Sequence, residues 1–116
     1  MQKAPNLPKS SKTPQFIAIQ TTTPTKKEAI KIAKYLLKKR LCACIQIRKI
    51  TSLYQWQQRI CKDKEYLLQI KARKKDFDAL AFYIHKIHSY NIPQIIALPI
   101  ESISEPYQKW LDDSIK

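Results

Sequence analysis

Apolar residues recur three and four positions apart in two segments of the chain, which predicts two amphipathic helices. The first helix is expected to open at Thr23-Pro24, with Pro24 in the first turn, and Thr25 has capping-box spacing to Glu28. The second helix is expected to begin near Phe77 and to end near Ser89-Tyr90-Asn91, and Ser104 is expected to cap a short last helix. The residues of the last helix expected to pack inward are Tyr107, Trp110 and Leu111.

Alternating apolar and polar residues predict four strands. The first covers about 16–22 and the last about 94–98, with Pro99 marking the end of the last strand or an exposed edge. Between the helices we predict a long β-hairpin whose polar turn lies at 62–64. The order β-α-β-β-α-β, followed by a helix, is the split βαβ plan of the ferredoxin-like α+β class.

Two helices can cover only one face of such a sheet. The second and third strands carry bulky residues on both sides, so the other face should remain partly apolar. Uncovered apolar surface of this kind usually binds a partner or another copy of the chain. Oligomerisation is therefore expected from the pattern alone.

Length and composition fit one domain. The chain has 116 residues, of which 44% are hydrophobic, enough for a single core. Residues 1–14 are polar and contain three prolines, which predicts a flexible basic tail before a domain at 15–116. This tail has no secretory apolar segment, and no apolar run approaches the ~20 residues that span a bilayer. The three cysteines are few for this length and odd in number, which does not fit a disulfide scaffold. A cytoplasmic protein with reduced thiols is therefore expected.

The charge of +13 favours attraction to polyanions. The lysines are spread along the sequence instead of forming one run, which favours a solvated basic surface over a dedicated polyanion site. Glycine is absent, which excludes phosphate-binding loops of the Walker and dinucleotide types. Its absence also excludes the two-residue hairpin turns that depend on glycine for positive φ.

A set of motifs in fixed order carries more information than the fold class. They are Ala43-Cys44-Ile45, Ser52-Leu53-Tyr54-Gln55-Trp56, Glu65, Lys71, His88-Ser89-Tyr90 with Pro93, and Tyr107 with Trp110-Leu111. This set resembles the CutA family of divalent-cation tolerance proteins over about residues 16–115. The resemblance implies a trimer whose long hairpin reaches onto a neighbour, weak binding of copper or another divalent cation, no organic cofactor, and a role in the response to metal ions.

Three positions depart from the family pattern. Gln58 replaces the glycine usual after the tryptophan, which puts the usual bend of the hairpin in doubt. Ser89 replaces the proline usual after the histidine. Gln94 replaces the glutamate usual after Pro93, so no role that needs a carboxylate there is carried over.

The candidate metal ligands are two cysteines and two histidines. Cys44 matches the family cysteine, and Cys42 lies two residues away on a strand, so both thiols could face one soft ion such as Cu(I). The alternative is that Cys44 is a small buried apolar residue. His88 matches the family histidine, and His85 lies three residues before it on one helix. Packing and capping at the helix end are the alternative roles of these two.

A polar and aromatic set resembles the lining of a cleft between subunits. If that cleft binds a ligand, Lys71 would provide charge for an anion and the aromatic residues would form the walls. The alternative is a structural ion pair between Lys71 and Glu65. The full set is Tyr54, Trp56, Glu65, Lys71 and Tyr90.

No residue pattern predicts an enzyme, because neither a nucleophile–base arrangement nor paired carboxylates can be recognised. The leading hypothesis is a trimeric cytoplasmic protein that binds copper or other divalent cations. The alternative is a trimeric scaffold or signalling module that binds a small anion or a protein partner in its clefts. Non-specific nucleic-acid binding ranks third, and no membrane partner is expected.

Overall fold

The structure, a computed structural model, describes residues 15–116, so the tail expected over 1–14 lies outside the described residues. The elements follow the expected order β-α-β-β-α-β-α and confirm the ferredoxin-like α+β class. They are β1 (Phe16–Thr23), α1 (Lys26–Lys38), β2 (Cys42–Trp56), β3 (Arg59–Arg73), a short 3-10 helix η1 (Lys74–Asp76), α2 (Phe77–Ile87), β4 (Ile96–Ile100) and α3 (Glu105–Ser114).

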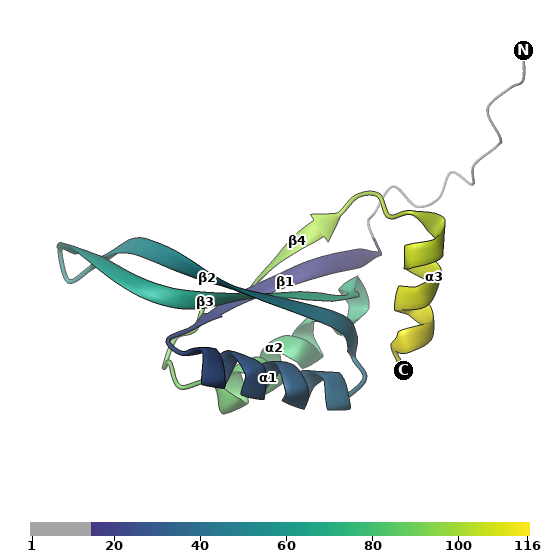
Figure 1. Cartoon of the computed structure of the whole chain (residues 1–116), viewed down its shortest axis with the longest axis horizontal. Helices are drawn as coiled ribbons and strands as arrows, with labels where there is room; N and C mark the ends of the chain where they lie inside the picture. The colour runs from purple at the N-terminus through teal and green to yellow at the C-terminus, as the bar shows by residue number, and fades with distance from the viewer. Residues whose placement is uncertain (1–14) are drawn as a thin grey trace, which may run out of the picture.

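The four strands form one antiparallel sheet in the order β2-β3-β1-β4. Helices α1 and α2 lie side by side against one face, and α3 lies at one end of the molecule (Figure 1). The face without α1 and α2 is called the open face below. Pro99 sits inside β4 and not at its end, because β4 is an edge strand that tolerates a residue without an N–H.

Helix α1 forms where its capping signals predict it. The Thr25 hydroxyl accepts a hydrogen bond from the Glu28 backbone N–H at 3.1 Å, which satisfies one of the free donors at the helix start. Pro24 precedes this cap, so its expected place in the first turn is wrong by two positions. The helix ends where Arg40 adopts a left-handed backbone with φ of 58°. Its buried face consists of Ala29, Ile32, Ala33 and Leu36.

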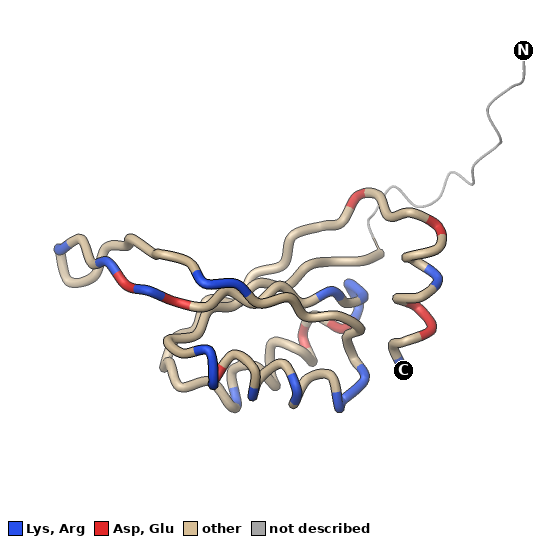
Figure 2. The backbone as a smooth tube through the Cα atoms, in the orientation of Figure 1, with Lys and Arg blue, Asp and Glu red and all other residues tan. Residues whose placement is uncertain are grey.

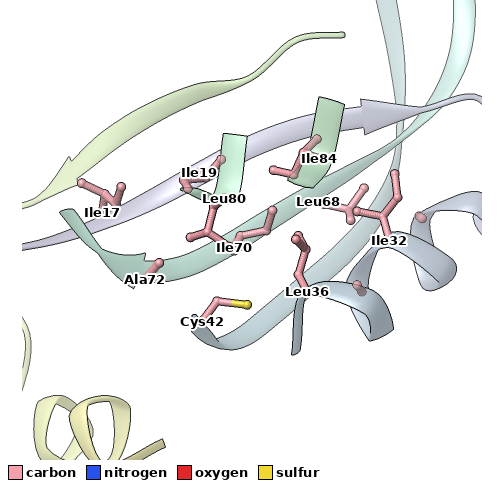
Figure 3. Close-up of a cluster of buried hydrophobic side chains, with 12 residues drawn as sticks. Ile17, Ile19, Ile32, Leu36, Cys42, Leu68, Ile70, Ala72, Leu80 and Ile84 are labelled. Carbon is pink, nitrogen blue, oxygen red and sulfur yellow. The ribbon is translucent and has the colours of Figure 1, made fainter. Parts of the chain in front are cut away.

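The main core lies between the sheet and the two long helices (Figure 3). Ile19 and Ile70 from neighbouring strands meet Leu36 and Ile84 from the helices, and all four are fully buried. Burial of each such side chain stabilises the fold by roughly 1.5–3 kcal/mol. A smaller cluster on the open face, built from Phe16, Leu111 and Ile115, anchors α3.

The hairpin turn lies at Gln57 and Gln58 and not at 62–64, so the expected position is wrong. Strands β2 and β3 pair as far as Trp56 opposite Arg59, which places 62–64 in the middle of the ladder. Those residues are polar because both faces of this part of the hairpin are exposed in the single chain. Both turn residues have positive φ, 50° and 63°, so a two-residue turn forms here without glycine.

Two other expectations need correction at helix ends. Helix α2 stops at Ile87, and His88 follows it as an extended capping residue. In α3 only Leu111 is fully buried. Tyr107 and Trp110 are 37% and 47% exposed and stack on each other with ring centroids 5.5 Å apart. The buried contacts at this end are made instead by Leu111 and by Ile115, which follows the helix, together with Phe16.

Candidate functional site

The thiols of Cys42 and Cys44 lie on opposite faces of the sheet. Cys42 is opposite Ala72 and Cys44 is opposite Lys71, so β2 contains one extra residue, Ala43, at this point. Cys42 enters the core beneath the helices and is 2% exposed, whereas Cys44 is half-buried beside α3. The expectation that both thiols face one ion is wrong, because the bulge restarts the alternation of side chains along the strand.

Burial makes Cys42 a core residue in chemical terms as well. Desolvation, with a smaller contribution from nearby Cys44, raises the pKa of the Cys42 thiol to about 12. The thiol therefore stays protonated at neutral pH, and the thiolate is the form that binds metal ions. Cys42 thus packs as a small apolar side chain.

Cys44 lies next to two polar residues of the open face. Burial, followed by the neighbouring Cys44 thiol, raises the pKa of Tyr107 on α3. Lys71, the cross-strand partner of Cys44, points its ammonium group at the Tyr107 ring from 5.8 Å and donates a hydrogen bond to Gln46 Oε1 at 2.7 Å. Lys71 therefore pairs with an amide and not with Glu65, so the structural ion pair that was the alternative role is absent from the described residues.

His88 is buried, and protein groups occupy both of its ring nitrogens. Nδ1 accepts a hydrogen bond from the backbone N–H of Tyr90 at 3.0 Å, which leaves the ring proton on Nε2. The Nε2–H group then donates a hydrogen bond to the Thr22 carbonyl at 2.8 Å. This tautomer is inferred from the hydrogen bonds. The only lone pair of the neutral ring is used by Tyr90, so a metal ion could bind His88 only after this loop opened.

His85 and His88 do not form a pair. His85 lies on the exposed side of α2, where its Nε2 is 3.2 Å from the Asn91 carbonyl. His88 leaves the helix and turns toward β1. Their expected proximity assumed a helix that continued through His88. Within residues 15–116, no three histidine, cysteine, aspartate or glutamate side chains come together as a metal-binding group.

Glu65 and Tyr90 form the most enclosed polar contact of the open face. The Tyr90 hydroxyl donates to Glu65 Oε2 at 2.8 Å, and Glu65 is only 9% exposed. Burial and then this hydrogen bond raise the pKa of Tyr90, so the hydroxyl remains a donor at neutral pH. The Tyr90 ring also packs against His88 with centroids 4.9 Å apart. The carboxylate of Glu65 is thereby fixed at the centre of the hairpin.

Tyr54 and Trp56 belong to the exposed end of the hairpin. Tyr54 donates a hydrogen bond to Asp63, which raises the pKa of the Tyr54 hydroxyl to about 12. Trp56 is 60% exposed and lies next to the turn. These two aromatic residues point to the same face as Glu65 because each is separated from the next by an even number of ladder positions.

One chain does not bring the five expected cleft residues together. Glu65 and Lys71 are six residues apart on β3, about 20 Å at ~3.3 Å per residue. Trp56, opposite Arg59, is about twice as far from Lys71 along the same ladder. Such a set can line one cavity only if the end of one hairpin reaches the base of another.

Sequence reasoning missed several residues that hold this region in place. Glu28 was recognised only as a capping residue, but its carboxylate accepts both the backbone N–H and the hydroxyl of Ser89, at 2.9 and 2.7 Å. Tyr107 was expected in the core, although its place in a Tyr-x-x-Trp motif could have indicated surface chemistry. The role of Gln46 beside Lys71 has no signal in the sequence.

Residues 17–114 match the family model described as CutA1 divalent ion tolerance protein. The chain is 38% identical over 99 residues to a protein from Xenopus laevis called CutA homolog, covering 84% of this chain. It is 36% identical to the divalent-cation tolerance protein CutA of Pyrococcus horikoshii, covering 87% of this chain and 99% of that protein. The chain spans 66% of the length of the Xenopus protein and 59% of a chloroplastic CutA from Arabidopsis thaliana.

Solved structures agree with the fold. A structure described as the periplasmic divalent cation tolerance protein CutA from Archaeoglobus fulgidus superposes with a TM-score of 0.85 at 34% identity, covering 87% of this chain and 99% of that one. CutA1 from Oryza sativa gives the same TM-score and identity over 91% of this chain and 98% of its own. At these identities the likeness extends to sequence as well as to fold.

Proposed function

The chain belongs to the CutA1 divalent ion tolerance family, and from that premise we propose that it acts in tolerance to divalent cations as a homotrimer with functional clefts between its subunits. The observation that carries this proposal is the wide separation of the five cleft residues along one ladder. Trp56 of one subunit would lie near Lys71 or Glu65 of the next. The proposed role is binding and not catalysis.

The open face supports assembly. Ile96 and Leu98 of β4 are each 44% exposed on this face, and Trp56 at the end of the hairpin is 60% exposed. A face with this much uncovered apolar surface gains stability when another subunit covers it. Three copies around one axis would cover the open faces and give every hairpin end an equivalent neighbour.

The proposed cleft has the polarity for a small anion. Glu65 is already occupied by the Tyr90 hydroxyl, so its negative charge faces a donor. Lys71 has no acidic partner among the described residues and donates its hydrogen bond to the neutral amide of Gln46. An anionic ligand would therefore pair with Lys71, and the aromatic side chains of Tyr54 and Trp56 from a neighbouring subunit would exclude water around it.

Copper is the cation that the accessible thiol chemistry favours, and we assign its ligation to Cys44. Soft thiolates select Cu(I), and Cys44 is the cysteine of the pair on the open face. Cys42 is protonated in the core and His88 uses both nitrogens, so neither supports this role without local opening. His85 is exposed but stands far from Cys44 on the opposite layer. Binding through one thiolate per subunit would be weak, and no organic cofactor is proposed.

Native mass spectrometry of the reduced protein tests assembly and copper binding together. We expect a trimer that takes up a whole number of Cu(I) ions. It should take up fewer Cu(II) ions and still fewer Zn(II) ions. Cys44→Ser should abolish uptake, whereas the matched variant Cys61→Ser, on the projecting hairpin, should keep it. A monomer would contradict the assembly, and unchanged uptake in Cys44→Ser would remove Cys44 as the ligand.

A thermal-shift screen of anionic metabolites at matched ionic strength tests the cleft. A genuine ligand should raise the melting temperature of the wild type, and above Kd the shift should grow with the logarithm of the ligand concentration. Lys71→Gln should lose this shift, while Lys109→Gln, which removes an exposed lysine paired with Asp113, should retain it. Equal shifts in both variants would reduce the effect to general salt screening and argue against the cleft.

The cytoplasm is the proposed location. All three cysteines are free thiols, which fits a reducing compartment. No helix within residues 15–116 combines the length and apolar character needed to cross a bilayer. Fractionation of cells that produce the protein would check this, because enrichment in an oxidising compartment would contradict it.

A further inference from the structure

Helix α1 and its end carry the largest surplus of positive charge of any element in the described chain. Residues 26–40 contain one acidic residue, Glu28, and a surplus of six positive charges. Figure 2 shows basic positions along the whole length of α1. The lysines look scattered in the sequence, but the turns of the helix gather them on one surface. The basic residues are Lys26, Lys27, Lys31, Lys34, Lys38, Lys39 and Arg40.

Four of these lysines form one row on the outer side of α1. Lys27, Lys31, Lys34 and Lys38 are spaced by four, three and four residues, opposite the buried face, and all four are exposed. The row is about 16 Å long at 1.5 Å per residue. No ion pair within residues 15–116 includes one of them. The neighbouring Glu28 carboxylate accepts two hydrogen bonds from Ser89, and its single negative charge still leaves residues 26–40 with the surplus of six positive charges.

An aromatic seam runs beside this row, between α1 and α2. Tyr35 and Tyr83 meet edge to face with centroids 6.0 Å apart, and Lys39 lies over both rings at 5.1 and 4.5 Å. Phe82 contacts Tyr83 edge to face at 5.5 Å and is 62% exposed. The outer flank of Phe82 borders an open groove of about 580 Å³ that Lys86 also lines.

We propose that the outer surface of α1 and α2 binds single-stranded nucleic acid without sequence preference. The lysine row would pair with consecutive phosphates, and Phe82 would offer its exposed ring for base stacking. A cationic track beside aromatic side chains is the combination by which proteins hold single strands irrespective of sequence. The row contains no arginine to make bidentate contacts with base edges, so it can follow the backbone but cannot read the bases.

A nucleic acid fits this surface better than an anionic membrane does. A helix that lies in a bilayer surface inserts an apolar face between the headgroups. Helix α1 has already buried its apolar face against the sheet through residues such as Ile32 and Leu36. The exposed aromatic side chain, Phe82, lies on the neighbouring helix beside a groove, where one flat base can approach it.

Fluorescence anisotropy with the full chain and a labelled oligothymidylate of about 20 nucleotides tests the proposal over a salt series. Lys31→Gln with Lys38→Gln should weaken binding at low salt by tenfold or more. It should also reduce the slope of log K against log salt by about 1.4, since each phosphate contact on a single strand contributes ~0.7. The matched double variant Lys62→Gln with Lys64→Gln removes the same charge from the hairpin and should change the slope far less. Equal losses in the two variants would overturn the assignment to α1.

The variant Phe82→Ala distinguishes the binding of nucleic acid from the binding of other polyanions. This variant should bind the thymidylate at least ~5-fold more weakly, yet bind an abasic oligonucleotide of equal length as the wild type does. Because Phe82 is largely exposed, the variant should keep the wild-type circular dichroism spectrum and melting temperature. Equal affinity of the wild type for thymidylate and abasic strands would overturn the stacking role. Tighter binding to vesicles containing phosphatidylserine than to any oligonucleotide would overturn the proposal in favour of a membrane.

Discussion

The two halves of the β2–β3 hairpin share one ladder but differ in what surrounds them. The anchored half, residues 42–50 with 65–73, packs under α1 and α2, and Leu68 there is fully buried. The projecting half, residues 51–56 with 59–64, extends beyond the helices (Figure 1). Its Ile60 is 75% exposed. A two-stranded hairpin is marginal in water by itself, so backbone pairing alone does not account for the projecting half. Contact with a neighbouring subunit would supply the missing support.

The largest expected difference between the halves concerns burial. Leu68→Ala should lower the free energy of unfolding by about 2–5 kcal/mol, because it removes a core side chain and leaves a cavity. Ile60→Ala, the control in the projecting half, should leave the stability of an isolated chain within about 0.5 kcal/mol. Urea unfolding at several protein concentrations measures both. A large, concentration-dependent loss in Ile60→Ala would show that subunit contacts bury this residue.

The turn of the projecting half should show a smaller effect of opposite sign. Gln58 has φ of 63°, a conformation that costs a residue with a Cβ about 1–2 kcal/mol and glycine much less. Gln58→Gly should therefore stabilise the protein by up to about 1 kcal/mol, since glycine also gains entropy in the unfolded chain. Gln55→Gly, in the adjacent strand, should destabilise it by a similar amount. Stabilisation by both substitutions would contradict the turn geometry.

Tyr54 should make a pH-dependent contribution to the stability of the folded chain, and this contribution should be smaller than that of the turn. Its pKa is about 12 in the folded chain and near 10 in the unfolded one, so the folded chain holds this proton more tightly. The stabilisation is complete below about pH 10 and is lost as the pH rises toward 12. Tyr54→Phe lacks the hydrogen bond to Asp63 and should be less stable than wild type near pH 8, with the difference shrinking near pH 12. Paired urea titrations at the two pH values measure it, and a constant difference would exclude this coupling.

Thiol labelling should distinguish the two halves without changing stability. Cys61 in the projecting half is partly exposed, whereas Cys42 in the anchored half is 2% exposed with a pKa of about 12. A maleimide reagent should modify Cys61 in the native protein and reach Cys42 only at the rate of unfolding. Mass spectrometry of peptides from a labelling time course measures both rates. Fast labelling of Cys42 would mean that the helices open from the sheet far below the global stability.

The fold could be predicted where local signals and burial agree. The spacing of apolar residues around Leu36 and the Thr25 cap determine α1, and alternation determines the core strands. The turn could not be found because the sequence shows polarity at 62–64 for a reason unrelated to turning, and Gln58 carries no turn signal. Polarity indicates a turn only in strands that have a buried face, which the projecting half lacks in the single chain.

The candidate site was less predictable because it depends on geometry between elements. The sequence identified Glu65, Tyr90 and Lys71, yet it could not show that Glu65 pairs with Tyr90 instead of Lys71. Spacing rules failed for Cys42 because they assume an uninterrupted strand. They failed for His88 because the helix stops one residue earlier. An irregularity of one residue in a strand or helix is enough to redirect a side chain. Such an irregularity leaves little trace in the amino-acid composition.

The bulge at residues 42–44 also marks a place where this chain can change its length during evolution. Deleting Ala43 would leave Cys42 opposite Ala72 and Cys44 opposite Lys71, so it would restore regular alternation without turning Ile45 or Gln46 to the other face. Deleting a residue of the regular ladder, such as Gln46, would instead shift the register and exchange the inner and outer surfaces of the strand. The hairpin end tolerates a different kind of change. Removing Trp56 and Arg59 together shortens both strands equally and leaves every remaining pair in register. Length changes in related chains should therefore occur as matched pairs near the turn or as loss of the single bulge residue, and be absent from the regular ladder between them.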